Sequence, residues 1–562
     1  MIKIKKLSIT NFAILISVFG IVIFGISLRH QRQTTPDKPI GSSPVVSAPT
    51  LSKNKKTESL AATQPKKQDS SNNSATTSSE NTFGSSLLAG KDYPQLAYYA
   101  LQSPNDPLVA SSWHHATIQS GRAWDMSTGS SSTVIAVIDT GFALDHEDLT
   151  GKWATNSGEI GITAVGSACW TGVASNKTTN NCDDDQNGYI DDTRGWDFVN
   201  DDNNPQTGSS NPIGNGTQHG TMVSSLIGAR SNNTIGSAGI DWQAKIMPLQ
   251  VLSDNGDGYT NAIAAAIQYA TDNGAKIINM SLGGSGYDVA MDAAITYATD
   301  RGVLVIAASG NCGASVANDC ANMVAPGRMA YPAKYPKVLA VGSTDSSDAR
   351  SSFSSYGPEL DVVAPGDLVG PLASWSSVYT TDGYVSAASG TSFASPIVAG
   401  VAGILRAQMG NPTMAQLQRA IIDSVDKVAG MSGAGRTDLY GAGRVNAHKA
   451  TLLASAYVNP PGSVGTTEIQ SRQPARGGLT RSASGAVATD EWILLVCRVD
   501  MTDTCSSTVT NGASIQRLNP NDLSKGAGVY YTFIKGSSLS AGTSTLSVHS
   551  RNYATKIGDV TR

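Results

Sequence analysis

The sequence predicts a layered α/β domain, built on a central and mostly parallel β-sheet, between residues 104 and 457. Short apolar runs alternate there with longer Ala-rich segments whose apolar residues recur at helical spacing. The run 134–138 is continuously apolar, which is typical of a strand covered by helices on both faces. Because strands alternate with helices, we expect parallel strands joined by right-handed crossovers.

The remaining elements of this domain follow the same two patterns. Residues 276–280 and 303–307 repeat the form of the first strand. Helical spacing predicts four helices, at 260–273, 286–300, 391–408 and 413–426.

The character of the chain changes after residue 457. Helical runs end, and apolar runs at 492–497, 528–534 and 543–548 are separated by Gly, Ser and Asn. Such runs predict strands joined by turns. We expect residues 458–562 to form a small β-sandwich-like module without a catalytic group.

The N-terminal region predicts export and a tether. Residues 7–28 carry no charge and follow three lysines, and as a helix they would span about 33 Å, enough to cross a bilayer. We expect residues 1–29 to be an uncleaved signal anchor that leaves the bulk of the chain outside the cytoplasm; a cleaved signal peptide is the alternative. Residues 30–103 are mostly Ser, Thr, Asn, Gln, Lys and Pro, a composition that predicts a disordered tether and a short lead-in.

Charge and cysteine content narrow the class of protein. The 562 residues carry a net charge of −4, which gives no electrostatic reason to expect a nucleic-acid partner. Six cysteines form three close pairs, which in an exported chain predict local disulfides. A metal site at these cysteines is disfavoured because no C-x-x-C occurs. The pairs are Cys169 with Cys182, Cys312 with Cys320, and Cys497 with Cys505.

Polar residues follow two of the predicted strands. Asp139 ends the strand 134–138 and opens a Thr-Gly turn, at the sheet edge where functional groups gather in α/β folds. A D-T-G triplet also suggests an aspartic protease, but that chemistry needs two carboxylates and this chain has one such motif. Asn311 follows the strand 303–307 and could donate its amide N–H to a developing oxyanion, or serve only as a turn residue.

Two residues stand at predicted helix starts. His219 opens a helix and is followed by Gly220, a setting that no other histidine of the chain shares. Ser392 lies in G-T-S-F-A-S-P, directly before an apolar run with helical spacing. Free N–H groups at a helix start can stabilise an oxyanion beside a nucleophilic serine, although Ser is also a common N-cap.

These motifs together resemble the subtilisin family of serine peptidases, in which Asp, His and Ser follow in this order. The resemblance covers roughly 104–457, and it implies a three-layer subtilisin-like fold and a serine endopeptidase. In that mechanism Ser392 attacks the peptide carbonyl, His219 transfers the proton, and Asp139 orients His219. Asn311 and the Ser392 backbone N–H would form the oxyanion hole.

The resemblance also implies where substrate binds. Ser281, Leu282, Gly283 and Gly284 would pair with an extended protein or peptide substrate as an added strand, so we expect broad specificity. Ala307, Ala308, Ser309 and Gly310 would line one wall of the primary pocket; being small and uncharged, they favour large apolar or neutral substrate side chains.

Two departures from the family pattern are visible. Phe393 stands where the family usually has Met, an apolar exchange that should leave the chemistry intact. The 80 residues between Asp139 and His219 exceed the spacing in the simplest members, and the added length holds Cys169, Cys182 and an acidic loop.

The acidic loop predicts a calcium site. Asp183, Asp185 and Asn187 supply oxygens at alternating positions before Gly188, and Tyr189 would add its carbonyl. Asp191 or Asp192 would close the shell. The loop is no full EF-hand, because its twelfth position is Arg194. Eight Asp against one Arg in 183–202 would repel one another without a cation; a solvated loop is the alternative. The resemblance implies a second calcium site, at Asp148 and Asn233.

We therefore expect a monomeric, calcium-stabilised serine endopeptidase that is tethered to a membrane or secreted. A peptide ligase with the same triad and a catalytically silent surface-binding protein are the rival interpretations. Nothing in the sequence suggests the protection of an acyl-enzyme from water that a ligase needs, and the complete set of catalytic residues disfavours a silent protein.

Overall fold

The computed structural model describes residues 103–206, 218–313, 320, 327, 329–374 and 383–458, together with strands and a short helix between 467 and 561. The chain divides into two units, 1–91 and 92–562. The expected anchor at 1–29 and nearly all of the expected tether lie outside the described residues. Within the described part, no helix has both the length and the apolar character to cross a membrane.

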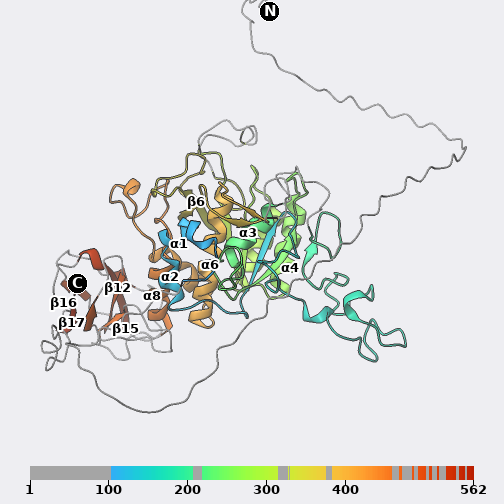
Figure 1. Ribbon diagram of the computed structural model, residues 1–562, viewed down its shortest axis with the longest axis horizontal. Coiled ribbons are helices and arrows are strands. Elements are labelled where there is room, and N and C mark those ends of the chain that lie inside the picture. The colour runs from blue at the N-terminus through green and yellow to red at the C-terminus, as the bar shows by residue number, and fades with distance from the viewer. Residues whose placement is uncertain are drawn as a thin grey trace, which may run out of the picture. The chain divides into compact units, whose positions relative to one another are not determined.

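A seven-stranded parallel sheet forms the centre of the larger unit, in the order β2-β3-β1-β4-β5-β6-β7 (Figure 1). The order shows crossovers on both sides of β1, as the strand–helix alternation predicts. The strands are β1 (Val134–Asp139), β2 (Trp196–Asp197), β3 (Lys245–Gln250), β4 (Ile277–Met280), β5 (Leu304–Ala308), β6 (Leu339–Thr344) and β7 (Val362–Pro365).

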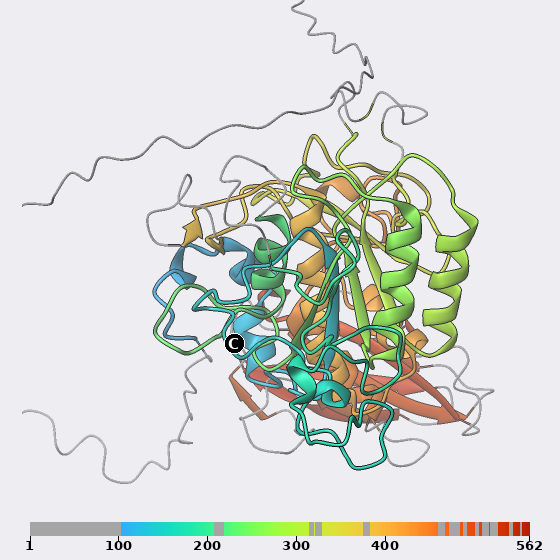
Figure 2. The same cartoon turned by 90° about the vertical axis from the view of Figure 1, so that its right-hand side faces the viewer.

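Helices cover both faces of this sheet, so the domain has three layers. Buried residues of α3 (His219–Gly228) and α6 (Thr391–Met409) share one core cluster. Those of α4 (Thr260–Asp272) and α5 (Val289–Asp300) share a second one. Figure 2 shows α4 and α5 as neighbouring green helices beside the strands. The described part of the domain has four more α-helices: α1 (Trp113–Thr117), α2 (Ser120–Trp124), α7 (Met414–Asp423) and α8 (Ala447–Val458).

Strand β1 illustrates why the continuous apolar runs become central strands. Ile135 and Val137 belong to the core cluster on one face, whereas Ala136 and Ile138 belong to the cluster on the other. Side chains alternate along a strand, so a strand buried on both faces must be apolar at every position. The sequence prediction of a layered, mostly parallel α/β domain is thereby confirmed.

The C-terminal region is rich in strands, also as predicted. One four-stranded sheet has the order β10-β12-β15-β14 and a second one β11-β17-β16-β13. Two short strands of the larger domain, β8 (Leu372–Ala373) and β9 (Tyr384–Val385), form a separate pair. The C-terminal strands are β10 (Thr467–Gln470), β11 (Ser484–Ala486), β12 (Trp492–Asp500), β13 (Cys505–Thr508), β14 (Gln516–Arg517), β15 (Ala527–Lys535), β16 (Thr543–Ser550) and β17 (Ala554–Thr561).

Two of the three expected disulfides are present. Cys169 is bonded to Cys182, with Cα atoms 5.9 Å apart, and Cys312 to Cys320, with Cα atoms 5.5 Å apart. The side chains of the third expected pair lie outside the described residues.

Two adjacent histidines are buried in α1. His114 is 2% exposed, and neither of its ring nitrogens has a hydrogen-bond partner among the described residues. The His115 ring lies between the Ser120 hydroxyl at 3.2 Å and the Ala238 carbonyl at 3.1 Å. A carbonyl only accepts, so the neutral ring donates from Nε2 and accepts at Nδ1. Burial lowers the pKa of His115 to about 4, and burial together with the charge of His115 lowers the pKa of His114.

We expect acid to destabilise this fold through the histidine pair. Below pH 6.5 the unfolded chain takes up protons that the buried rings do not, so stability present above that pH is lost as pH falls towards 4. For His115 alone the loss amounts to about 3 kcal/mol. Urea unfolding measured at pH 7 and pH 4.5 tests this. The variant His114→Phe removes one of the two groups and should show a smaller loss; a loss equal to that of wild type would contradict the assignment.

Candidate active site

The carboxyl end of β1 and the first residue of α3 form the first part of the site. Asp139 is the last residue of β1, and His219 begins α3. Their side chains are joined by a hydrogen bond of 2.7 Å between His219 Nδ1 and Asp139 Oδ1. The chain therefore returns to the same edge of the sheet over a sequence separation of 80 residues.

Gly220 permits this close approach. A Cβ atom at this position would lie 2.8 Å from the Thr140 carbonyl oxygen and 2.9 Å from that of Gly141. The Gly220 N–H also donates to the Thr140 hydroxyl at 3.0 Å. Any larger residue would push the start of α3 away from β1, which explains why glycine follows the histidine.

The carboxylate of Asp139 is fully buried, and the His219 side chain is 22% exposed. Asp139 Oδ1 also accepts the Thr140 N–H at 2.7 Å, while Oδ2 has no partner among the described residues. Burial by itself lowers the pKa of His219, but the charge and hydrogen bond of Asp139 outweigh it and leave this pKa above its usual value. Asp139 therefore fixes the ring orientation and favours the protonated imidazole.

Ser392 is the second residue of α6 and faces the end of β4. Its hydroxyl donates to the Ser281 carbonyl at 3.1 Å, and the Ser281 hydroxyl donates to the Ser392 carbonyl at 2.8 Å. No hydrogen bond joins Ser392 to His219 among the described residues, so the hydroxyl must rotate before His219 can take its proton. Hydrogen bonds of this kind often form only with substrate bound.

Asn311 is anchored at one end of its amide. Its Oδ1 accepts both the Thr391 N–H and the Thr391 hydroxyl, each at 2.9 Å. These bonds leave Nδ2 as a donor, and Asn311 lines the cleft in front of Ser392. The amide of Asn311 is thus tied to Thr391, the first residue of α6 and the neighbour of Ser392.

A cleft of 890 Å³ opens in front of these residues. Its wall includes His219, Asn311, the segment Ser281–Gly284 and acidic residues such as Asp257 and Asp288. Ala307, Ala308 and Ser309 are buried behind this lining, and the Gly310 N–H donates to the Thr391 hydroxyl at 3.2 Å. The structure therefore places the first predicted substrate segment in the cleft and the second one behind it.

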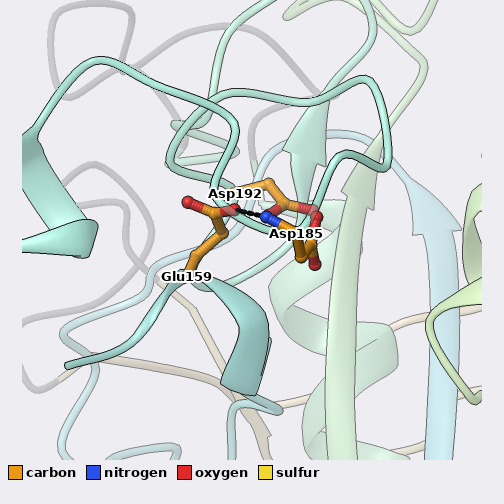
Figure 3. Close-up of side chains that lie close together, drawn as sticks. All are labelled: Glu159, Asp185 and Asp192. Atoms are coloured by element: carbon orange, nitrogen blue, oxygen red, sulfur yellow. Dashed lines mark hydrogen bonds between the residues drawn. The ribbon is translucent and has the colours of Figure 1, made fainter. Parts of the chain in front are cut away.

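Three carboxylates converge beside the predicted calcium loop (Figure 3). Glu159, Asp185 and Asp192 each offer an oxygen within 4.8 Å of the others. Glu159 is fully buried, and its Oε2 has no partner among the described residues. Burial raises the pKa of Glu159 to about 7, and the charges of Asp185 and Asp192 add to the rise. A buried carboxylate with an unpaired oxygen fits a bound cation.

Sequence reasoning missed Glu159 because it comes from outside the loop pattern. Asn187, which the sequence predicts as a ligand, donates from Nδ2 to Asp192 at 3.0 Å, and its Oδ1 accepts the Tyr189 N–H at 2.8 Å. Asp183 accepts the backbone N–H groups of Asn187 and Gly188, at 3.1 and 2.7 Å. The ring of Tyr189 packs against Trp196, with centroids 5.0 Å apart.

The residues predicted for a second cation site also lie together. Asn233 Nδ2 donates to Asp148 at 3.2 Å, and Asp148, which is fully buried, accepts the Ser237 N–H at 3.0 Å. Burial raises the pKa of Asp148 to about 7, and the charge of Asp106 adds to the rise. Asp106, which belongs to no motif of the sequence, accepts the Asn233 N–H at 3.0 Å. A cation here would offset the unfavourable free energy of burying the charges of Asp148 and Asp106.

Comparison with known proteins identifies the family. Residues 130–443 match the model of the subtilase family, Peptidase S8. Thermitase from Thermoactinomyces vulgaris is 37% identical over 350 residues, which cover 62% of this chain and 99% of that protein. A thermophilic serine proteinase from Bacillus sp. (strain AK1) is 33% identical over 359 residues, covering 64% and 71%. The halolysin-like extracellular serine protease Nep from Natrialba magadii is 38% identical over 307 residues, covering 55% and 46%.

The family match spans the seven strands of the central sheet, α3, α6 and all the residues that line the cleft. The family and the relatives agree with the sequence-based expectation of a serine peptidase. This chain belongs to the subtilase family and is a serine-type endopeptidase.

Proposed function

We propose that this endopeptidase hydrolyses peptide bonds through Asp139, His219 and Ser392, by way of an acyl-enzyme. The observation that carries the proposal is the 2.7 Å hydrogen bond between His219 and the buried Asp139, at the sheet edge where α6 presents Ser392. The ring of Phe393, the residue after Ser392, lies with its centroid 5.6 Å from that of His219, which supports a place for Ser392 close to the imidazole that would activate it.

In the proposed reaction Ser392 Oγ leaves the Ser281 carbonyl and attacks the peptide carbonyl carbon. Its proton passes to His219 Nε2, which then gives it to the departing amine. Water, deprotonated by the same nitrogen, releases the acyl group from Ser392. Asp139 stays ionised throughout and stabilises the imidazolium.

Asn311 Nδ2 and the Ser392 backbone N–H would bind the oxyanion of both tetrahedral intermediates. The two bonds from Thr391 that fix Asn311 Oδ1 support this role, because they determine where the amide nitrogen points. The segment Ser281–Gly284 would hold the substrate as an added strand, and Gly284 already pairs with Tyr331 in strand fashion, at 2.8 Å. Main-chain pairing is insensitive to sequence, which supports broad specificity.

We propose that calcium stabilises the fold at two places. Glu159, Asp185, Asp192 and the Asn187 amide would hold one ion, with Asp183 and the Tyr189 carbonyl near it. Asp148, Asn233 and Asp106 would hold the other. The ion would supply charge neutralisation for carboxylates that folding brings together.

We further propose that the enzyme works outside the cytoplasm. The two disulfides of the peptidase domain support an oxidising compartment, and one similar protease is named as extracellular. Residues 104–457 would be the peptidase domain and 458–562 an accessory module. Residues 1–29 would direct export, and whether they stay as an anchor decides between tethering and secretion.

We expect a fluorophosphonate probe to label the purified protein at Ser392, because the oriented His219 activates that hydroxyl. The variant Ser392→Ala should remain folded and unlabelled, with kcat/KM lower by at least about a thousandfold. Folded, calcium-loaded protein that fails to label would overturn the catalytic assignment. In mass spectra with an added amine, hydrolysed product should dominate; an aminolysis product in its place would favour the ligase.

The pH profile should show that His219 works unprotonated. Its pKa is raised, so kcat/KM should fall as pH decreases through a value above 6.5. In Asp139→Asn the carboxylate charge that raises the pKa of His219 is gone, and burial alone acts on the ring. The acid limb, which is the fall of kcat/KM at low pH, should therefore move to a lower pH than in wild type. In the same variant kcat should fall about ten-thousandfold. The variant Asp300→Asn, which removes an exposed charge on α5, should keep the wild-type limb. An unmoved limb in Asp139→Asn would contradict the role of the carboxylate.

Removal of calcium with a chelator should lower Tm, and added calcium should restore it. An ion at a hundredfold its Kd adds about 2.7 kcal/mol of stability. Glu159→Gln and Asp148→Asn should each remove part of this response, and both together nearly all of it, whereas Asp300→Asn should keep it. If the Tm of wild type does not change with calcium, both calcium sites are excluded. If the Tm of Glu159→Gln changes with calcium as much as that of wild type, the site at Glu159 is excluded.

A further inference from the structure

A fully buried amide lies between the central sheet and α6. Asn279 is the third residue of β4 and is 0% exposed. Its neighbour on the same face of the strand, Ile277, belongs to the core cluster that contains Ala394 and Ile397 of α6. A polar side chain is therefore placed in a layer that is otherwise apolar.

Two hydrogen bonds connect this amide to both elements. The Ser395 hydroxyl of α6 donates to Asn279 Oδ1 at 2.6 Å. Asn279 Nδ2 donates to the Ser281 hydroxyl at 3.0 Å. Asn279 thereby joins the helix that carries Ser392 to the segment that follows β4.

The Ser281 hydroxyl continues the chain of bonds to Ser392. It donates to the Ser392 carbonyl at 2.8 Å, and the Ser392 hydroxyl donates to the Ser281 carbonyl at 3.1 Å. Because the single proton of the Ser281 hydroxyl is used in this way, its oxygen must accept, and Asn279 supplies the donor. A carboxylate or an aliphatic residue at position 279 could not supply it.

Stability alone does not account for this amide. Burying a polar group is unfavourable unless its bonds are made, and replacing both partners of a buried hydrogen bond by apolar groups of the same shape can be nearly neutral or stabilising. Networks of this kind fix one arrangement of the groups that they connect. The arrangement fixed here is that of Ser392 against Ser281.

We propose that Asn279 is a positioning residue for catalysis, which sets the place of Ser392 through Ser395 and Ser281. The proposal rests on the proposed role of Ser392 as the nucleophile. Ser281 belongs to the segment that would hold the substrate, so the network ties the nucleophile to the strand that places the scissile bond. An error of about 1 Å in such a distance can lower the rate about a hundredfold.

The variant Asn279→Leu tests the inference, because leucine is similar in size and makes none of the bonds. We expect kcat per titrated active site to fall about tenfold to a hundredfold, with KM within about twofold of wild type. Tm should fall moderately, because the buried Ser395 and Ser281 hydroxyls each lose a partner, but that loss does not alter the kcat of each folded site. The acid limb of the pH profile should stay in place, since neither His219 nor Asp139 is touched. Ser395→Ala, which leaves the Ser281 bonds intact, should lower kcat only about threefold to tenfold.

Gln408→Leu provides a matched control. Gln408 lies near the other end of α6, and its amide donates to the Thr451 carbonyl at 3.0 Å and to the Ser455 hydroxyl at 2.7 Å. Both exchanges replace an amide that donates to a serine hydroxyl by leucine, and both amides contact or belong to α6, but Gln408 lies 16 residues from Ser392 along this helix. We expect its kcat to equal that of wild type.

The outcomes separate this inference from the proposed function. Wild-type protein that neither labels nor hydrolyses peptides would overturn the function of Ser392. Active wild type with an equally active Asn279→Leu would leave that function standing and overturn the positioning role. A fall in activity explained by loss of titratable sites and a lower Tm, with unchanged kcat per site, would assign Asn279 to folding and also overturn it.

Discussion

The burial of α6 against the parallel sheet is the constraint on which the site depends. This helix is apolar over most of its length and packs on the face of the sheet that holds Ile135, Ile277 and Ile306. Its axis and depth are therefore fixed by many close contacts, which interiors packed at crystal-like density do not allow to shift freely. Ser392 takes its position from this packing, because it lies in the first turn of the same helix.

The polar side chains at this edge of the sheet take their positions from the strand or helix that carries them, because each lies at the end of such an element. Asp139 is held at the end of β1, and His219 at the start of α3, where Gly220 lets the two elements meet. Such positions explain how a buried carboxylate can be kept charged next to an imidazole: the hydrogen bond and the opposite charge offset part of the cost of burial. Asn279 is likewise held by short hydrogen bonds, to Ser395 of α6 and to Ser281 directly after β4.

The sequence predicted the strands and helices that a local pattern of apolar residues marks. It did not predict the features that arise only from contacts between distant parts of the chain. The continuous run before Asp139 and the apolar spacing after Ser392 carried enough information to place a strand and a helix within a few residues of their bounds. Strand β3 escaped notice because Pro248 interrupts its pattern, although the neighbouring strands impose an extended backbone. Glu159 and Asp106 could not be selected, since each meets its partners only through folding and neither belongs to a spaced motif.

The acidic residues of the proposed calcium site and the proposed catalytic residues lie at opposite ends of strand β1. Val134, the first residue of β1, lines a cavity together with Asp185 of the acidic cluster, whereas Asp139 at the other end contacts His219. A strand of six residues separates these ends by about 17 to 20 Å. At that distance an ion held by Glu159, Asp185 and Asp192 would affect the chemistry through the stability of the fold, because its field is weakened by separation and by screening. A loss of activity on removal of that ion should therefore follow the fraction of folded protein and leave the turnover of each intact site unchanged.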